Sequence, residues 1–147
     1  MLECRLFQSD PEKFACARFL REAVFVREQG FPPELEFDRE DEEAVHVVAY
    51  LDGRPVGTGR LLFRRQDPPG FLYIGRLCVL REHRGKGVGR KIMERLMERA
   101  RAQGAAGALI VAQVPAMAFY EELGFCQQGK IFYTGTVPHV EMLCRFG

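Results

Sequence analysis

Apolar runs alternate along the chain with polar, glycine-containing segments, and their periodicity separates strands from helices. Seven short runs rich in β-branched and aromatic residues predict β-strands. The predicted strands cover residues 3–7, 45–51, 55–63, 71–79, 108–112, 125–133 and 140–146. The run at 71–79 is apolar on both faces, so we expect it near the centre of a sheet. Asp52-Gly53 predicts a tight hairpin between the second and third strands.

Three segments repeat their apolar residues with helical spacing. The predicted helices cover about residues 10–26, 87–103 and 115–123. Asp10 and Pro11 are a typical N-cap and first helical residue, while Gly104 and Gly124 end the second and third helices. The order β-α-β-β-β-α-β-α-β-β predicts an α/β (α+β) fold, with a mixed sheet and helices on both faces.

Length and composition are those of one globular domain, which we expect to cover residues 1–147. Apolar residues make up 47% and charged residues 28%, which excludes a disordered chain. The net charge of +1 gives no global attraction to nucleic acid or to an anionic membrane. The longest apolar stretch, 105–120, is too short to span a bilayer and contains Gly107 and Pro115.

The five cysteines are odd in number and include no C-x-x-C pair, so they indicate reduced thiols. They have no histidine or carboxylate at ligand spacing, so we expect no structural metal. The first residues, Met1 to Arg5, lack a basic segment followed by an apolar one. Together these features predict a cytoplasmic protein.

Residues 34–43 contain seven acidic side chains and one arginine. The segment is expected to form a loop or a short irregular helix. Its acidic side chains are expected to form a solvated face. The alternative is a negatively charged lip that attracts a cationic amine.

The most informative segment is a glycine-rich turn between the strand at 71–79 and the helix at 87–103. Gly85, Gly87 and Gly89 remove side chains from the turn, so successive backbone N–H groups can point at one anion near the positive end of the helix. Arg84, Lys86, Arg90 and Lys91 add positive charge around it. The spacing fits neither the P-loop nor the dinucleotide-binding fingerprint.

Arg84-x-x-Gly87-x-Gly89 after a buried strand resembles the coenzyme A loop of the GNAT N-acetyltransferase superfamily. Gln113 followed by the segment 118–125, with sequence AFYEELGF, resembles the second signature of that family. Residues 27–32 and Val137-Pro138-His139 are similar to those of small stand-alone bacterial members. The resemblance extends over nearly the whole chain and implies a mostly antiparallel central sheet of six to seven strands.

The resemblance also implies acetyl-CoA as acyl donor, without a metal. The glycine turn would hold the pyrophosphate, and the pantetheine would lie beside the end of the strand at 71–79 as an additional strand. A backbone N–H near Cys78 or Val79 would polarise the thioester carbonyl. The residues expected to contact the coenzyme are Leu77, Cys78, Val79, Arg84, Gly85, Lys86, Gly87, Val88, Gly89, Arg90, Gln113 and Phe119.

For catalysis, the resemblance places Tyr120 at the coenzyme sulfur, where it would protonate the departing thiolate. The alternative for Tyr120 is a half-buried packing residue. Cys78 is expected to be a small buried residue and not a nucleophile.

The general base is left open among four residues. They are Glu28, His46, His83 and His139. Glu28 and His139 are favoured because both match motifs of the subgroup. His83 is expected to be solvated, and His46 to be buried and hydrogen-bonded. Thr134 stands where relatives often carry a glutamate.

The predicted function is therefore transfer of acetyl to a primary amine by direct attack in a ternary complex. Polyamines, amino sugars, aminoglycosides, peptide N-termini and lysine all fit as acceptors. The alternative is an acyl-CoA-binding sensor without turnover. Binding to nucleic acid is disfavoured because the chain lacks interleaved basic and aromatic residues. An exposed edge of the last strand pair would allow a homodimer.

Overall fold

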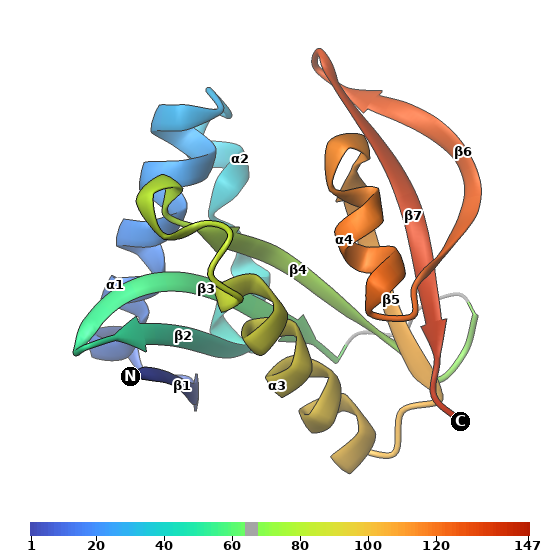
Figure 1. The fold of residues 1–147 in the computed structure, drawn as a ribbon, viewed down its shortest axis with the longest axis horizontal. Coiled ribbons are helices and arrows are strands. Elements are labelled where there is room, and N and C mark those ends of the chain that lie inside the picture. The colour runs from blue at the N-terminus through green and yellow to red at the C-terminus, as the bar shows by residue number, and fades with distance from the viewer. Residues whose placement is uncertain (64–67) are drawn as a thin grey trace.

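The computed structural model describes residues 1–63 and 68–147. The predicted loop at 64–70 therefore lies partly outside the described residues. The chain forms one seven-stranded sheet in the order β1-β2-β3-β4-β5-β7-β6 (Figure 1). The strands are β1 (Leu2–Gln8), β2 (Val45–Leu51), β3 (Arg54–Leu62), β4 (Phe71–Val79), β5 (Gly107–Gln113), β6 (Cys126–Thr134) and β7 (Val137–Arg145).

Neighbouring strands are antiparallel except for the parallel pair β4 and β5. The sheet is therefore mixed and mostly antiparallel, and β4 is its central strand, as the sequence predicts. The helix between β4 and β5 provides the crossover that a parallel pair requires.

Helices cover both faces of the sheet, which confirms the expected layering (Figure 1). The helical segments are α1 (Pro11–Arg21), a π-helix η1 (Glu22–Glu28), α2 (Pro33–Glu36), the 3-10 turns η2 (Arg39–Glu42), η3 (Arg81–His83) and η4 (Val114–Ala116), α3 (Val88–Ala102) and α4 (Met117–Glu122). α1 and η1 pack on one face, while α3 and α4 pack on the other. Among the described residues, no helix is long and apolar enough to cross a membrane.

Two glycines of β3 allow α3 to pack unusually close to the sheet. A Cβ added at Gly57 would lie 2.8 Å from the Ile92 side chain, and one at Gly59 would lie 3.0 Å from both Ile92 and Leu96. Such distances are too short for ordinary carbon contacts, so larger residues would push the helix outward. This contact fixes the position of α3 against β3, and thus the position of the turn that leads into α3.

The two central strands separate soon after they pair. β4 and β5 are in register only from Phe71 to Tyr73 against Gly107 to Leu109, although both strands continue beyond. Figure 1 shows the two halves of the sheet diverging at this point, with α4 lying over β5. The residues of β4 after Tyr73 therefore pair with β3 on one side only.

The last hairpin is tighter than the sequence prediction. β7 begins at Val137, three residues before the predicted start at Val140, and pairs with β6 up to Thr134. Val137-Pro138-His139 therefore belongs to a strand and not to a loop. This register sets His139 opposite Gln113 of β5.

Candidate active site

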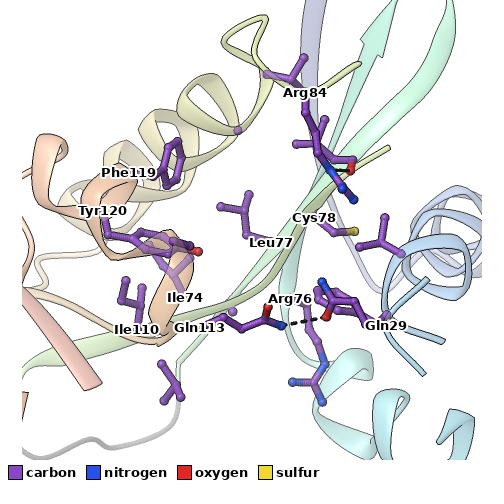
Figure 2. Close-up of a pocket in the computed structure, with 18 of the residues that line it drawn as sticks. Gln29, Ile74, Arg76, Leu77, Cys78, Arg84, Ile110, Gln113, Phe119 and Tyr120 are labelled. Carbon is purple, nitrogen blue, oxygen red and sulfur yellow. Dashed lines mark hydrogen bonds between the residues drawn. The ribbon is translucent and has the colours of Figure 1, made fainter. Parts of the chain in front are cut away.

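A pocket of 790 Å³ lies where β4 and β5 separate (Figure 2). Its volume is in the range typical of small-molecule sites, about 300–1,000 Å³. Most residues assigned to the site from the sequence line it. They are Leu77, Cys78, Val79, Arg84, Gly85, Gly87, Val88, Gly89, Arg90, Gln113, Phe119, Tyr120 and His139. Glu28 and Lys86 are not among the lining residues.

The glycine turn forms one end of the pocket. Gly85 and Gly87 have φ of 77° and 82°, a left-handed conformation that favours glycine. A Cβ at either position would meet nothing within 4 Å, so the space above the turn is open. Within the described chain, α3 has neither a side-chain N-cap nor an acidic residue in its first turn. Its first N–H groups therefore face this space at the positive end of the helix, an arrangement suited to an anion.

The free edge of β4 forms the floor of the pocket. Cys78 and Val79 pair with Thr58 and Gly57 of β3. On the opposite edge, the pairing of β4 with β5 ends at Tyr73. A bulge interrupts the pairing with β3 near Arg76, whose φ of 54° is unusual for a residue other than glycine. Backbone groups at this edge are therefore outside the sheet ladder and suit an extended, amide-containing ligand.

Tyr120 projects from α4 into the pocket, with its hydroxyl directed toward Leu77 (Figure 2). Its ring packs edge-on against Phe119 and Phe125, with centroids 5.0 and 6.0 Å away. Burial, assisted by the nearby Tyr73 and Cys78, raises the pKa of the phenol well above its ordinary value of 10.0. The hydroxyl therefore keeps its proton at neutral pH and is a potential donor.

Cys78 faces the pocket from β4 but is 5% exposed. Burial raises the pKa of its thiol to about 12. Because the thiolate is the nucleophilic form of cysteine, this environment disfavours covalent catalysis by Cys78. The structure thus supports the expected packing role.

Glu28 is ion-paired, although the sequence analysis favoured it as a base. Arg84 donates two hydrogen bonds to its carboxylate, at 2.7 Å from Nη1 and 2.7 Å from Nη2, and Arg81 donates a third at 3.3 Å. The hydrogen bond from Arg84 is the main reason why the pKa of Glu28 is lowered. Arg84 also donates from Nε to the carbonyl of Val79 at 2.9 Å. The pair therefore ties η1 to the glycine turn, and it occupies a guanidinium that was expected to face the phosphates.

His139 is better placed to accept a proton in the pocket. Its Nδ1 lies 3.0 Å from the carbonyl oxygen of Val137. A carbonyl can only accept, so Nδ1 carries the hydrogen and Nε2 of the neutral ring is the acceptor. The ring is 8% exposed and stacks on Phe132 with centroids 5.9 Å apart. This fixed tautomer favours His139 over Glu28 as the base.

The other two histidines are placed differently. His46 is buried beside Phe7 and donates from Nε2 to the carbonyl of Asp41 at 2.9 Å, as expected for a structural residue. Burial lowers its pKa below the ordinary 6.5. His83 lines the pocket near the glycine turn, and its Nδ1 is buried without a partner among the described residues. The expectation of a solvated His83 is therefore wrong for that nitrogen.

Gln29 is a lining residue that the sequence analysis did not assign to the site. Gln113 donates from Nε2 to Oε1 of Gln29 at 2.8 Å, a hydrogen bond between β5 and the end of η1 (Figure 2). The two amides thus join the two halves of the molecule across the pocket. Nothing in the local sequence around Gln29 marks this contact, because the partners are 84 residues apart.

A group of six charged side chains, here called the charged cluster, corrects the interpretation of the acidic segment. Its members are Arg21, Glu36, Asp38, Asp41, Arg60 and Arg76. Glu36 and the side chain of Asp41 are 6% and 8% exposed, so a solvated face is wrong for them. Arg21 and Arg60 stand within apolar segments, and this could have indicated the cluster. An arginine that is buried with such a segment requires carboxylate partners.

Within the charged cluster, arginines and carboxylates lie next to one another at short distances. Arg21 contacts Glu36 at 2.8 Å and Asp41 at 2.7 Å, while Arg60 contacts Asp38 and Asp41, both at 2.7 Å. Burial opposes ionisation of the two aspartates, but the arginines outweigh it and the pKa of each is lowered. Arg76 joins the cluster through Glu36 at 3.1 Å and also lines the pocket.

Comparison with known proteins agrees with this architecture. The acetyltransferase (GNAT) family profile matches residues 11–125. The uncharacterized N-acetyltransferase YjcF of Bacillus subtilis is 39% identical over 133 residues, covering 90% of this chain and 92% of its own. An acyl-CoA N-acyltransferase of Pseudomonas aeruginosa superposes with a TM-score of 0.86 at 27% identity, covering 98% of this chain and 99% of its own.

Escherichia coli ElaA shares the fold, with a TM-score of 0.86 at 24% identity and coverage of 99% of this chain and 100% of its own. The chain therefore belongs to the GNAT acetyltransferase family. Membership establishes acyl transfer from an acyl-CoA as its class of activity.

Proposed function

We propose that the protein transfers acetyl from acetyl-CoA to a primary amine by direct attack, with both substrates bound together. The observation that carries the proposal is the single pocket that joins an anion-binding helix end, a free strand edge, a protonated phenol and an imidazole acceptor. Each group matches one requirement of thioester aminolysis. Family membership supports the acyl-CoA donor.

The coenzyme would use the backbone more than charged side chains. In this proposal the first N–H groups of α3, with Gly85 and Gly87, bind the pyrophosphate. The pantetheine lies along the free edge of β4 at Leu77 to Val79, and a backbone N–H there polarises the thioester carbonyl. Gly89 has a supporting role, since a Cβ there would lie 3.3 Å from Phe119 and displace α4.

The proton transfers follow from the two side chains. Nε2 of His139, directly or through a water, takes one proton from the ammonium and passes it to solvent, and takes the second from the nitrogen once the C–N bond has formed. The free amine forms the new C–N bond at the thioester carbonyl. When the C–S bond breaks, Tyr120 protonates the coenzyme thiolate and later recovers a proton from solvent. The products are an amide and coenzyme A.

An acyl-CoA sensor remains the second candidate, because binding alone requires only the helix end and the strand edge. Tyr120 and His139 favour the enzyme, since a sensor needs neither a proton donor nor an acceptor beside the thioester. Release of free coenzyme A from acetyl-CoA, followed over a panel of amines, separates the two. Coenzyme binding without release on any amine would favour the sensor.

The coenzyme site itself is tested by thermal unfolding with and without acetyl-CoA. A ligand at 100 times its Kd stabilises the fold by about 2.7 kcal/mol, or roughly 5–10 °C in Tm for a chain of this size. Gly87→Glu places a carboxylate at the helix end and should abolish the shift.

Gly104→Glu is the matched control, because Gly104 lies beyond the other end of α3 with a φ of 81° and equally open surroundings. Both variants carry the same backbone strain and the same charge. A full Tm shift in Gly87→Glu would place the coenzyme elsewhere, whereas loss of the shift in both would indicate a general effect on the helix.

A further inference from the structure

The end of the pocket away from the glycine turn is lined mainly by apolar side chains. Phe25 comes from η1, Phe31 from the following loop and Leu35 from α2. Leu35 is 69% exposed, which places it at the rim. Figure 2 shows Arg76 and Gln29 at this end, across Cys78 from Arg84. We call this region, defined by Phe25, Phe31, Leu35 and Arg76, the acceptor end.

Among the residues that the structure describes, the acceptor end has no carboxylate without an arginine partner. Among the described lining residues, the acidic ones are Glu36 and Glu122. Glu36 is buried and contacts both Arg21 and Arg76, within a cluster of three carboxylates and three guanidiniums. Glu122 lies on α4, outside the four residues that define the acceptor end, and also lines a second, smaller pocket. Arg76, whose side chain is 24% exposed and contacts Glu36 and Asp38, is the cation that these residues place at the acceptor end.

From this we infer that the acceptor is a primary amine with an apolar body and no second positive charge, an inference that rests on the function proposed above. An apolar body would contact Phe25, Phe31 and Leu35 and leave water. A second ammonium would lose hydration there without a carboxylate partner and would face Arg76. Polyamines and aminoglycosides are thus excluded from the acceptors that the sequence alone allows.

The inference is tested with two amines that differ in one charge. Pentylamine and 1,5-diaminopentane have the same carbon chain, but the second carries an ammonium at both ends. We expect kcat/KM for acetylation to favour pentylamine by about tenfold or more, as for a desolvated like-charge contact. Equal values, or a preference for the diamine, would overturn the inference.

Affinity for the two amines is measured in parallel by calorimetry on the protein saturated with coenzyme A. This readout does not depend on turnover. Absence of acetylation of both amines, with pentylamine still binding about tenfold tighter, would refute the proposed catalysis and support the inferred acceptor class. Failure of pentylamine to bind would overturn the inference even if other amines are acetylated.

A variant at the rim provides the converse test. Leu35→Glu adds an unpaired carboxylate at the acceptor end and should lower the preference for pentylamine several-fold, toward the diamine. Phe19→Glu is the control, since Phe19 is 50% exposed on α1 and does not line the pocket. An unchanged preference in Leu35→Glu, or the same change in Phe19→Glu, would show that charge at this rim does not select the acceptor.

Discussion

Tyr120 and Cys78 face the same pocket, and burial raises the pKa of both side chains. The consequence differs because their proposed roles differ. A phenol that keeps its proton is ready to donate it, whereas a thiol that keeps its proton is a poor nucleophile. One environment thus favours acid catalysis by Tyr120 and disfavours a covalent intermediate on Cys78.

Tyr120→Phe should reduce kcat roughly 10–100-fold, at the low end for general acid catalysis because a coenzyme thiolate is a fair leaving group. The ring remains, so folding and coenzyme affinity should be retained. Because the pKa of Tyr120 lies above 10.0, its titration should not appear in kcat profiles below that pH. The measurement is kcat against pH at saturating amine. Equal kcat in both proteins would reduce Tyr120 to a packing residue.

Cys78→Ala should keep turnover within about tenfold and lower the free energy of unfolding by on the order of 1 kcal/mol, because it removes one buried sulfur. Denaturant unfolding and kcat/KM measure the two effects. Mass spectrometry of the protein after incubation with acetyl-CoA provides a separate check. An acetyl group trapped on Cys78 would contradict direct attack and indicate a two-step mechanism.

Most of the residues assigned from local sequence line the pocket, because the glycine turn and the tyrosine helix are continuous segments with fixed spacing. Local sequence could not rank Glu28 against His139. That choice depends on Arg84, which neutralises one candidate from 56 residues away, and on a strand register that fixes the tautomer of the other. Both are tertiary contacts without a local signal.

Among the elements, η1 has a connecting function. Glu28 at its C-terminal end binds Arg84 of the glycine turn, and Gln29 immediately after it binds Gln113 of β5. One short segment thus contacts both the glycine-turn end of the pocket and the far half of the sheet. Periodicity predicted this helix to about Val26, but could not predict its change to π geometry, which carries it on to Glu28.

Glu28→Gln should therefore act on coenzyme binding and not on proton transfer. We expect KM for acetyl-CoA to rise several-fold, because the glutamine amide cannot form the charge-assisted bidentate pair with Arg84 that holds the turn. In contrast, kcat should be largely retained in this variant and fall strongly in His139→Ala. If instead Glu28→Gln lowers kcat strongly while KM is unchanged, Glu28 is the base.

At the scale of the whole molecule, the buried His46 links stability to pH. Since burial lowers its pKa from the ordinary 6.5, the unfolded chain takes up this proton first as the pH falls. The contribution of His46 to the free energy of unfolding should therefore be fully present above pH 6.5. It should decrease as the pH falls below 6.5, and the decrease should stop once the pH is below the pKa of His46 in the folded protein. Asp38 and Asp41, whose pKa values are lowered from 3.8, add a further loss only in more acidic solution.

The measurement is Tm between about pH 5 and pH 7.5, where histidine is the side chain that ordinarily titrates. His46→Gln should flatten the dependence on pH, although it lowers Tm throughout. His83→Gln serves as the control for an imidazole at the pocket. A slope that persists in His46→Gln would assign the effect to another group.

The fold class and a mixed sheet could be predicted because element order and apolar periodicity restrict the possible sheets, and β4 was correctly expected at the centre. Two features of the whole molecule were beyond local pattern. The divergence of β4 from β5 depends on where pairing stops, and the charged cluster depends on side chains brought together from α1, α2, η2, β3 and β4. Both arise only when distant segments are packed.

The end of pairing between β4 and β5 also limits how far this protein can be stabilised. An unpaired strand edge is normally a hazard, because other chains can add to it. Here the edge lies inside the pocket between β4 and β5. An extended small molecule can reach it, whereas the edge of another sheet cannot. Substitutions that extended the ladder beyond Tyr73 would add hydrogen bonds and raise stability, but they would close the pocket between the two strands. Selection for a more robust fold and selection for turnover therefore oppose each other at this place.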